Sequence, residues 1–149
     1  MPIQAPRTPK RILITGGSGF IGSNLVRLLM TDFGYDGRVI NVDKLTYAAN
    51  PANLADIARK YPDRYRFEAI DICDSEKMSE IVREEQIDCV IHLAAESHVD
   101  RSILGPAEFV RTNVNGTFSL LEAVRGFWGD RQDVLFHHVS TDEVFGSLD

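Results

Sequence analysis

A glycine-rich turn at residues 15–22 constrains the fold more than any other part of the chain. It follows a short β-branched run, Arg11–Thr15, and precedes apolar residues at helical spacing. Glycines at 16, 19 and 22 are typical of a strand-to-helix turn that holds a pyrophosphate. Gly16 would allow a tight turn, Gly19 would let the backbone approach the anion, and Gly22 would let the helix pack closely. The helix N-terminus would offer N–H groups to the anion. A glycine-rich turn without a ligand is the alternative interpretation.

Apolar runs and helical patterns alternate along the rest of the chain, which is the rhythm of a parallel sheet. We expect strands over residues 11–15, 38–42, 65–70, 88–93 and 134–140. Helices are expected after the turn, over about 50–60, from a cap at Ser75, and over 106–124. In the last of these, one face carries Val110, Val114, Phe118 and Leu121. The predicted fold class is α/β, a Rossmann-like doubly wound parallel sheet that is incomplete, with five strands and alternating helices; another α/β arrangement is the alternative.

Composition excludes several functional classes. The net charge is −6 and no Lys/Arg run exceeds two residues, which argues against a free-standing nucleic-acid binder. No apolar run approaches 18 residues, so we expect no membrane span. Cys73 and Cys89 are too few for a disulfide scaffold, and we expect buried thiols in a reducing, cytoplasmic compartment. The four histidines match no zinc pattern, so no metal site is expected.

Acidic residues follow two of the predicted strands. Asp43 ends the second strand, 21 residues after Gly22, where a carboxylate can accept hydrogen bonds from the hydroxyls of an adenosine ribose. It would repel a 2′-phosphate, which favours NAD over NADP, although the adjacent Lys44 could face a phosphate. Asp71 follows the third strand and could accept from an adenine amino group. It could equally begin or cap a helix.

Longer motifs connect the chain to a known family. Residues 15–22, 41–50, 92–102 and 140–146 resemble the extended short-chain dehydrogenase/reductases and, within them, the dTDP-glucose 4,6-dehydratases. The first stretch is shared by the whole superfamily, whereas the Thr141-Asp142-Glu143 run is typical of nucleotide-sugar dehydratases rather than epimerases. The resemblance extends from about Lys10 onward.

The resemblance implies NAD as the cofactor and assigns residues to its parts. Phosphate contacts would come from Gly16, Gly19, Phe20, Ile21 and Gly22. Adenosine contacts would come from Asp43, Lys44, Leu45, Thr46, Asp71 and Ile72. Further contacts would come from Leu93, Ala94, Ala95, Glu96 and Thr112.

The resemblance also implies a reaction on a nucleotide sugar. In this family dTDP-glucose is oxidised at C4, water is eliminated across C5 and C6, and hydride returns to C6. Ser97 and Thr141 would contact the substrate, Asp142 would act as acid and Glu143 as base. An exposed turn is the alternative interpretation of Asp142 and Glu143. Neighbours on a regular strand point to opposite faces, so both can reach one substrate only if the chain turns there.

The sequence also lacks parts that the resemblance implies. No Tyr-x-x-x-Lys pair is present, although this superfamily uses one for the oxidation. We therefore expect a tail over residues 1–10, a partial NAD-binding domain over 11–149, and a substrate domain missing from this chain, with a homodimer at full length. Alternatives are another nucleotide-sugar dehydratase or epimerase acting on a UDP-sugar, and a non-catalytic truncated NAD-binding module.

Overall fold

One parallel sheet forms the centre of the computed structural model, which describes residues 8–146. Its strands are β1 (Arg11–Thr15), β2 (Arg38–Val42), β3 (Tyr65–Glu68), β4 (Cys89–His92) and β5 (Leu135–His138), and every neighbouring pair is parallel. The order β3-β2-β1-β4-β5 confirms the predicted Rossmann-like sheet. The order in which the chain adds strands reverses between β1 and β4, and ligands of such sheets bind beyond the carboxyl ends of the strands at that point. The last three strands end earlier than predicted.

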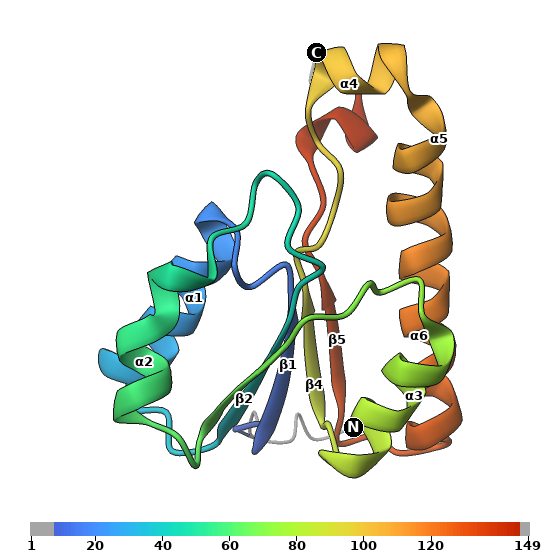
Figure 1. Ribbon diagram of the computed structural model, residues 1–149. Coiled ribbons are helices and arrows are strands. Elements are labelled where there is room, and N and C mark those ends of the chain that lie inside the picture. The colour runs from blue at the N-terminus through green and yellow to red at the C-terminus, as the bar shows by residue number, and fades with distance from the viewer. Residues whose placement is uncertain (1–7, 147–149) are drawn as a thin grey trace.

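Helices cover both faces of the sheet (Figure 1). On one side lie α1 (Phe20–Thr31) and α2 (Ala55–Lys60), the latter preceded by a 3₁₀ turn over Pro51–Leu54; on the other lie α3 (Ser75–Glu84) and α6 (Thr117–Trp128). Alternate residues of β1 enter the two cores: Ile12 and Ile14 pack with Val26, whereas Leu13 packs with Leu120. The central strands β1 and β4 are buried on both faces and read as nearly continuous apolar runs, whereas β3 and β5 at the edges are less buried and carry polar residues.

The predicted helix over 106–124 is longer and less regular than expected. It begins as α5 (Pro106–Phe109), passes through a π-helical segment over Val110–Gly116 and continues as α6. A short helix that we did not predict, α4 (Val99–Leu104), precedes it.

The apolar stripe of this helix faces away from the sheet. Val110, Val114, Phe118 and Leu121 have exposed fractions between 43% and 63%. The opposite face packs instead, because its small residues allow close approach: a Cβ added to Gly116 would lie 2.6 Å from the Ile72 side chain. The spacing correctly grouped the four residues but did not show which face is buried.

Two local expectations need correction. The N-cap of α3 is Asp74, whose carboxylate accepts from the Lys77 N–H at 3.1 Å, so Ser75 is the first helical residue and not the cap. Of the two thiols, Cys89 is buried but Cys73 is only half-buried, with its Sγ 3.2 Å from the Arg111 carbonyl oxygen. In the part of the chain that the structure describes, no helix is long and apolar enough to cross a membrane.

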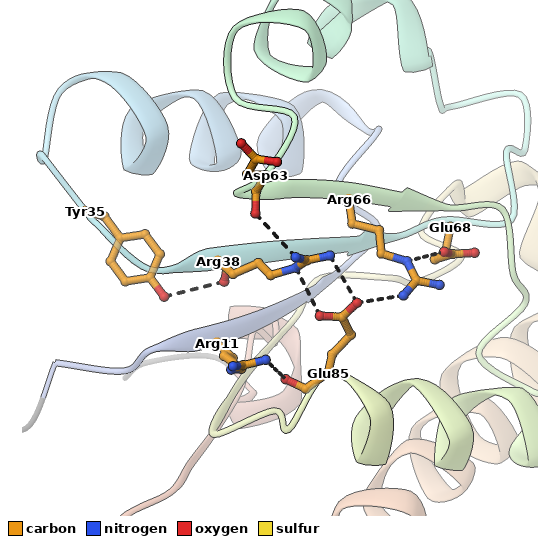
Figure 2. A network of polar contacts seen from close by, with 7 residues as sticks. All are labelled: Arg11, Tyr35, Arg38, Asp63, Arg66, Glu68 and Glu85. Atoms are coloured by element: carbon orange, nitrogen blue, oxygen red, sulfur yellow. Dashed lines mark hydrogen bonds and ion pairs between the residues drawn. The ribbon is translucent and has the colours of Figure 1, made fainter.

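An ionic network closes the amino-terminal edge of the sheet (Figure 2). The Glu85 side chain is only 7% exposed and lies 3.0 Å from Arg38 and 2.6 Å from Arg66, while its carbonyl accepts from Arg11 at 3.1 Å. Since Glu85 ends α3 and the arginines belong to β1, β2 and β3, the network ties this helix to three strands. These charges therefore have a structural role at the edge opposite the carboxyl ends of the strands.

The end of α3 allows a stability prediction. Gln86 is exposed and has φ 54°, a left-handed conformation that costs non-glycine residues about 1 kcal/mol. Gln86→Gly should raise the free energy of unfolding by about 0.5–1 kcal/mol, measured by urea denaturation. Gly34 is the matched control, because it is also left-handed and an added Cβ would meet no atom within 4 Å. Gly34→Ala should lower the free energy of unfolding by a similar amount. A destabilising Gln86→Gly would contradict this account.

Candidate functional site

The glycine-rich turn joins β1 to α1 and packs tightly against its surroundings. Gly16 has φ +72°, and an added Cβ would lie 2.8 Å from the Ala94 backbone nitrogen. At Gly22 an added Cβ would lie 2.2 Å from the Gly16 carbonyl oxygen, so the close approach is between α1 and the turn itself. Gly19 is different, because its added Cβ would meet only the Gly16 oxygen at 3.3 Å. The turn therefore has a packed inner side and an open outer side at Gly19.

The first turn of α1 is free to meet an anion through its backbone. Gly19 is the N-cap, and no side chain within the described residues 8–146 caps the helix. The first N–H groups of a helix lack intrahelical partners. The Phe20 and Ile21 side chains are apolar and have no donor, so these two residues can bind an anion only through their backbone N–H groups.

Asp43 is held rigidly at the end of β2. It is a buried residue; its Oδ2 accepts from the Ser18 N–H at 3.0 Å and its Oδ1 from the Leu45 N–H at 2.8 Å. Leu45 itself has a left-handed φ of 58°, so the chain turns sharply just after this N–H. Each carboxylate oxygen has a further lone pair, so the two oxygens can still accept hydrogen bonds from two hydroxyls.

The Lys44 ammonium is bonded to other residues of the site. Its Nζ donates to Thr112 Oγ1 at 3.0 Å and lies 3.9 Å from Glu96 Oε1. Thr112 comes from the π-helical segment and Glu96 from the loop after β4. The ammonium thus connects β2 to two other elements.

These elements enclose a cavity of about 110 Å³ at the carboxyl ends of the strands. Most of the predicted cofactor residues line it: Gly16, Gly19, Asp43, Lys44, Thr46, Ile72, Leu93, Ala94, Ala95, Glu96 and Thr112. The sequence analysis missed four lining residues: Val42, Ala48, Ala49 and Ile70. Of the other predicted cofactor residues, Phe20, Ile21, Gly22, Leu45 and Asp71 do not line the cavity. Hydrophobic spacing at the ends of β2 and β3 could have found Val42 and Ile70.

Asp71 does not line this cavity and has partners of its own. Its Oδ1 accepts from the Cys73 N–H at 2.9 Å and its Oδ2 lies 2.9 Å from Arg111 Nη2. Partial burial opposes ionisation, but the Cys73 N–H and the positive charges of Lys44 and Arg111 lower the pKa of Asp71. The carboxylate therefore shapes the turn before α3, which was the alternative interpretation of this residue.

A buried histidine supports the loop that lines the cavity. His92 Nδ1 lies 2.6 Å from Thr15 Oγ1, and His92 Nε2 lies 2.9 Å from Thr117 Oγ1. Burial, together with the neighbouring His138, lowers the pKa of His92 to about 4, so the imidazole is neutral at physiological pH. Thr15 Oγ1 also accepts from the Ala94 N–H at 3.3 Å, so the network reaches the cavity wall.

A second link holds the same loop from the side of the long helix. The Asn113 amide accepts from the Glu96 N–H at 2.8 Å and donates to the Glu96 carbonyl at 2.9 Å. Asn113 belongs to the π-helical segment, as Thr112 does. This segment therefore places two consecutive side chains against the cavity wall.

The predicted catalytic residues follow β5, at the same edge of the sheet. The strand ends at His138, and Asp142–Phe145 forms a 3₁₀ turn. Thr141 Oγ1 donates to Asp142 Oδ1 at 3.3 Å. For Glu143 the structure describes the backbone, and its side chain lies outside the description. Thr141, Asp142 and Ser97 do not line the cavity, so the structure gathers most of the predicted cofactor residues around it but not these three predicted substrate or catalytic residues.

The glycines of the turn allow a test of what each contributes to the fold. Gly16→Ala should lower the free energy of unfolding by about 3 kcal/mol, because it adds a left-handed side chain and displaces the loop at Ala94. Gly19→Ala is the matched control and should cost about 1 kcal/mol or less. Chemical denaturation measures both, and equal losses would contradict the distinction.

Comparison with known proteins agrees with this geometry. The sequence model of the GDP-mannose 4,6 dehydratase family matches residues 13–149. The dTDP-glucose 4,6-dehydratase of Shigella flexneri is 53% identical over 143 residues, covering 93% of this chain and 38% of the relative. Two solved structures are also similar. One is the dTDP-glucose 4,6-dehydratase DesIV of Streptomyces venezuelae with NAD and TYD bound, at 46% identity and a TM-score of 0.79, covering 93% of this chain and 42% of that one.

The other solved structure is a UDP-glucose-4-epimerase of Stenotrophomonas maltophila with NAD and formylated UDP-arabinopyranose bound. It has 29% identity and a TM-score of 0.78, covering 94% of this chain and 39% of that one. The chain spans about 38% of the length of the curated relative from Shigella flexneri. Since the family match covers nearly all of the sequence, the chain belongs to the GDP-mannose 4,6 dehydratase family.

Proposed function

We propose that this chain is the NAD-binding part of a nucleotide-sugar 4,6-dehydratase that acts on dTDP-glucose. The observation that carries the cofactor assignment is Asp43, whose carboxylate is held by two backbone N–H groups beside the glycine-rich turn. The 53% identity with a dTDP-glucose 4,6-dehydratase supports the reaction and the substrate.

The residues of the cavity fit NAD. Asp43 would accept from the adenosine ribose hydroxyls, and the backbone N–H groups of Phe20 and Ile21 would bind the phosphates beside Gly19, with Gly22 keeping α1 close to the turn. Ile72 and Thr46 would enclose the adenosine, with Leu45 and Asp71 shaping its surroundings. A 2′-phosphate would meet the Asp43 carboxylate, while Lys44 is already bonded to Thr112. When bound, NAD would take up a hydride from the sugar and later return it.

The residues after β5 suit an elimination of water. We assign Asp142 as the acid that protonates the departing 6-hydroxyl and Glu143 as the base that removes the C5 proton. The 3₁₀ turn over Asp142–Phe145 supports this pairing, because neighbours on a turn need not point to opposite faces as they do on a strand. Thr141 would donate to the 4-oxygen of the sugar, and Ser97 would contact the nucleotide sugar.

Further parts would have to come from outside the 149 residues. The proposed oxidation needs a Tyr-x-x-x-Lys pair, which the sequence lacks, and a domain that binds dTDP. We propose that residues 11–149 are part of the NAD-binding domain, that 1–10 form a tail, and that the missing parts lie in the length that this chain does not span. We place the protein in the cytoplasm, which its two free thiols support.

An epimerase acting on a UDP-sugar is the second candidate. The similarity to the UDP-glucose-4-epimerase structure favours this candidate, because that structure has a similar fold and holds NAD. The Asp142-Glu143 pair favours the dehydratase.

Product analysis tests the proposed reaction in the complete natural protein that carries this sequence. With dTDP-glucose, mass spectrometry should detect the 4-keto-6-deoxy product. Glu143→Gln and Asp142→Asn should each lower kcat by about 10²–10⁴-fold, the range for losing a general acid or base. Glu76→Gln, an acidic residue on α3 away from the cavity, is the control and should keep the wild-type rate.

Three outcomes would contradict the proposal. Wild-type kcat in Glu143→Gln would exclude this residue as the base. With UDP-glucose supplied instead, formation of its C4 epimer without dehydration, identified by NMR because the epimers have equal mass, would favour the epimerase. Product formed by the 149 residues alone, above the Glu143→Gln level, would show that the missing pair is not needed.

We also propose that the complete protein is a homodimer that buries the exposed stripe of Val110, Val114, Phe118 and Leu121. An apolar helical face this exposed is typical of an interface. Phe118→Asp should therefore shift the protein from dimer to monomer in sedimentation velocity. Glu76→Asp, away from the stripe, should not. An unchanged dimer in Phe118→Asp would exclude this face, and a wild-type monomer would exclude the homodimer.

A further inference from the structure

A polar side chain lies fully buried within β2. Asn41 has none of its surface exposed, and its neighbours in the strand are Ile40 and Val42, which are buried and apolar. Burying an amide costs free energy unless its polar atoms are bonded. Another apolar residue would suit the sheet better, so the position of this amide calls for an explanation.

The Asn41 amide contacts the glycine-rich turn from the sheet, at Ser18. Its Nδ2 donates to Ser18 Oγ at 3.2 Å and to the Tyr65 hydroxyl at 3.0 Å. Burial raises the pKa of Tyr65, so this hydroxyl is neutral and able to accept. Asn41 Oδ1 has no hydrogen-bond partner among the described residues, and it lies 2.2 Å from where a Cβ on Gly17 would stand.

Ser18 connects this amide to the proposed ribose site. It is buried; its N–H donates to Asp43 Oδ2 at 3.0 Å and its carbonyl accepts from the Asn50 N–H at 2.9 Å. Asn41 lies in β2 and Asp43 directly follows its last residue, Val42; both contact Ser18, Asn41 at the Ser18 hydroxyl and Asp43 at the Ser18 N–H. Ser18 is therefore held by both, and its position determines where its N–H meets the carboxylate.

Gly17 has a spatial reason to be glycine. Its φ is not in the left-handed region, unlike that of Gly16, so an alanine backbone is allowed there. The obstacle is the Asn41 side chain, whose Cγ would stand 2.7 Å from the added Cβ. The Asn41 side chain therefore occupies the space that a side chain at residue 17 would need.

We propose that Asn41 is a positioning residue for the cofactor: acting through Ser18, it holds Asp43 in place to bind the ribose, and it is the reason that residue 17 must be glycine. This inference rests on the proposed function for its ribose part. The pairing of Gly17 with Asn41 does not depend on it.

The first experiment is a double-mutant cycle on NAD affinity, measured by isothermal titration calorimetry in the complete natural protein. Asn41→Ala should weaken NAD binding roughly tenfold, the effect of losing about one good hydrogen bond. In an Asp43→Ala background the same change should weaken it less than twofold, because Asn41 acts through Asp43. Asn53→Ala, an exposed asparagine on the 3₁₀ turn before α2, is the control and should bind NAD as the wild type does. Equal weakening in both backgrounds would overturn the proposal.

Single-bond variants keep the test decisive if Asn41→Ala does not fold. Ser18→Ala removes the hydroxyl that Asn41 contacts but keeps the N–H on Asp43, and Tyr65→Phe removes only the other acceptor. Ser18→Ala should weaken NAD binding several-fold, and more than Tyr65→Phe does. An effect of Tyr65→Phe equal to or larger than that of Ser18→Ala would contradict a route through Ser18.

The second experiment needs no cofactor and follows thermal unfolding. Gly17→Ala should lower the midpoint, and in an Asn41→Ala or Asn41→Ser background the drop should be less than half as large. The same drop in every background would show that Asn41 does not set the requirement for glycine. A wild-type protein that binds no NAD but shows this rescue would refute the proposed function while supporting the pairing.

Discussion

The close contact between the glycine-rich turn after β1 and the loop after β4 is the constraint on which the site depends. The two strands are neighbours, and the chain leaves them in opposite directions to form the two halves of the sheet. At Gly16 the turn approaches the Ala94 backbone so closely that no side chain fits between them. The cavity is therefore lined partly by the backbone of Gly16 and Ala94, and its other lining residues come from the elements around this contact.

Three sets of hydrogen bonds stiffen the walls around that contact. Asp43 is held by N–H groups of the turn and of Leu45, the loop after β4 is held by Thr15 and Asn113, and Lys44 bridges to Thr112. Each set joins residues far apart in the sequence. A site built in this way is organised before a ligand arrives, so little ordering free energy is spent on binding.

Local patterns were enough to predict the sheet, the turn and Asp43. Strands that are buried on both faces read as apolar β-branched runs, and the turn needs glycine for reasons of backbone geometry. The π-helical segment over Val110–Gly116 could not be predicted in the same way, because its residues bond to Lys44 and Glu96, which are distant in the sequence and give no local pattern. The ion pair of Asp71 with Arg111, forty residues away, could not be read from the local pattern either, because it depends on where the long helix lies. Asn41 was overlooked although a polar residue in a buried strand is itself a signal.

The most direct test of the account is the affinity of the complete natural protein for NAD and for NADP, measured by calorimetry under identical conditions. The account predicts NAD binding at least tenfold tighter, because the Asp43 carboxylate would accept from a 2′-hydroxyl and would repel a 2′-phosphate, while Lys44 is bonded to Thr112. Equal affinities, tighter binding of NADP, or no binding of either dinucleotide would contradict it.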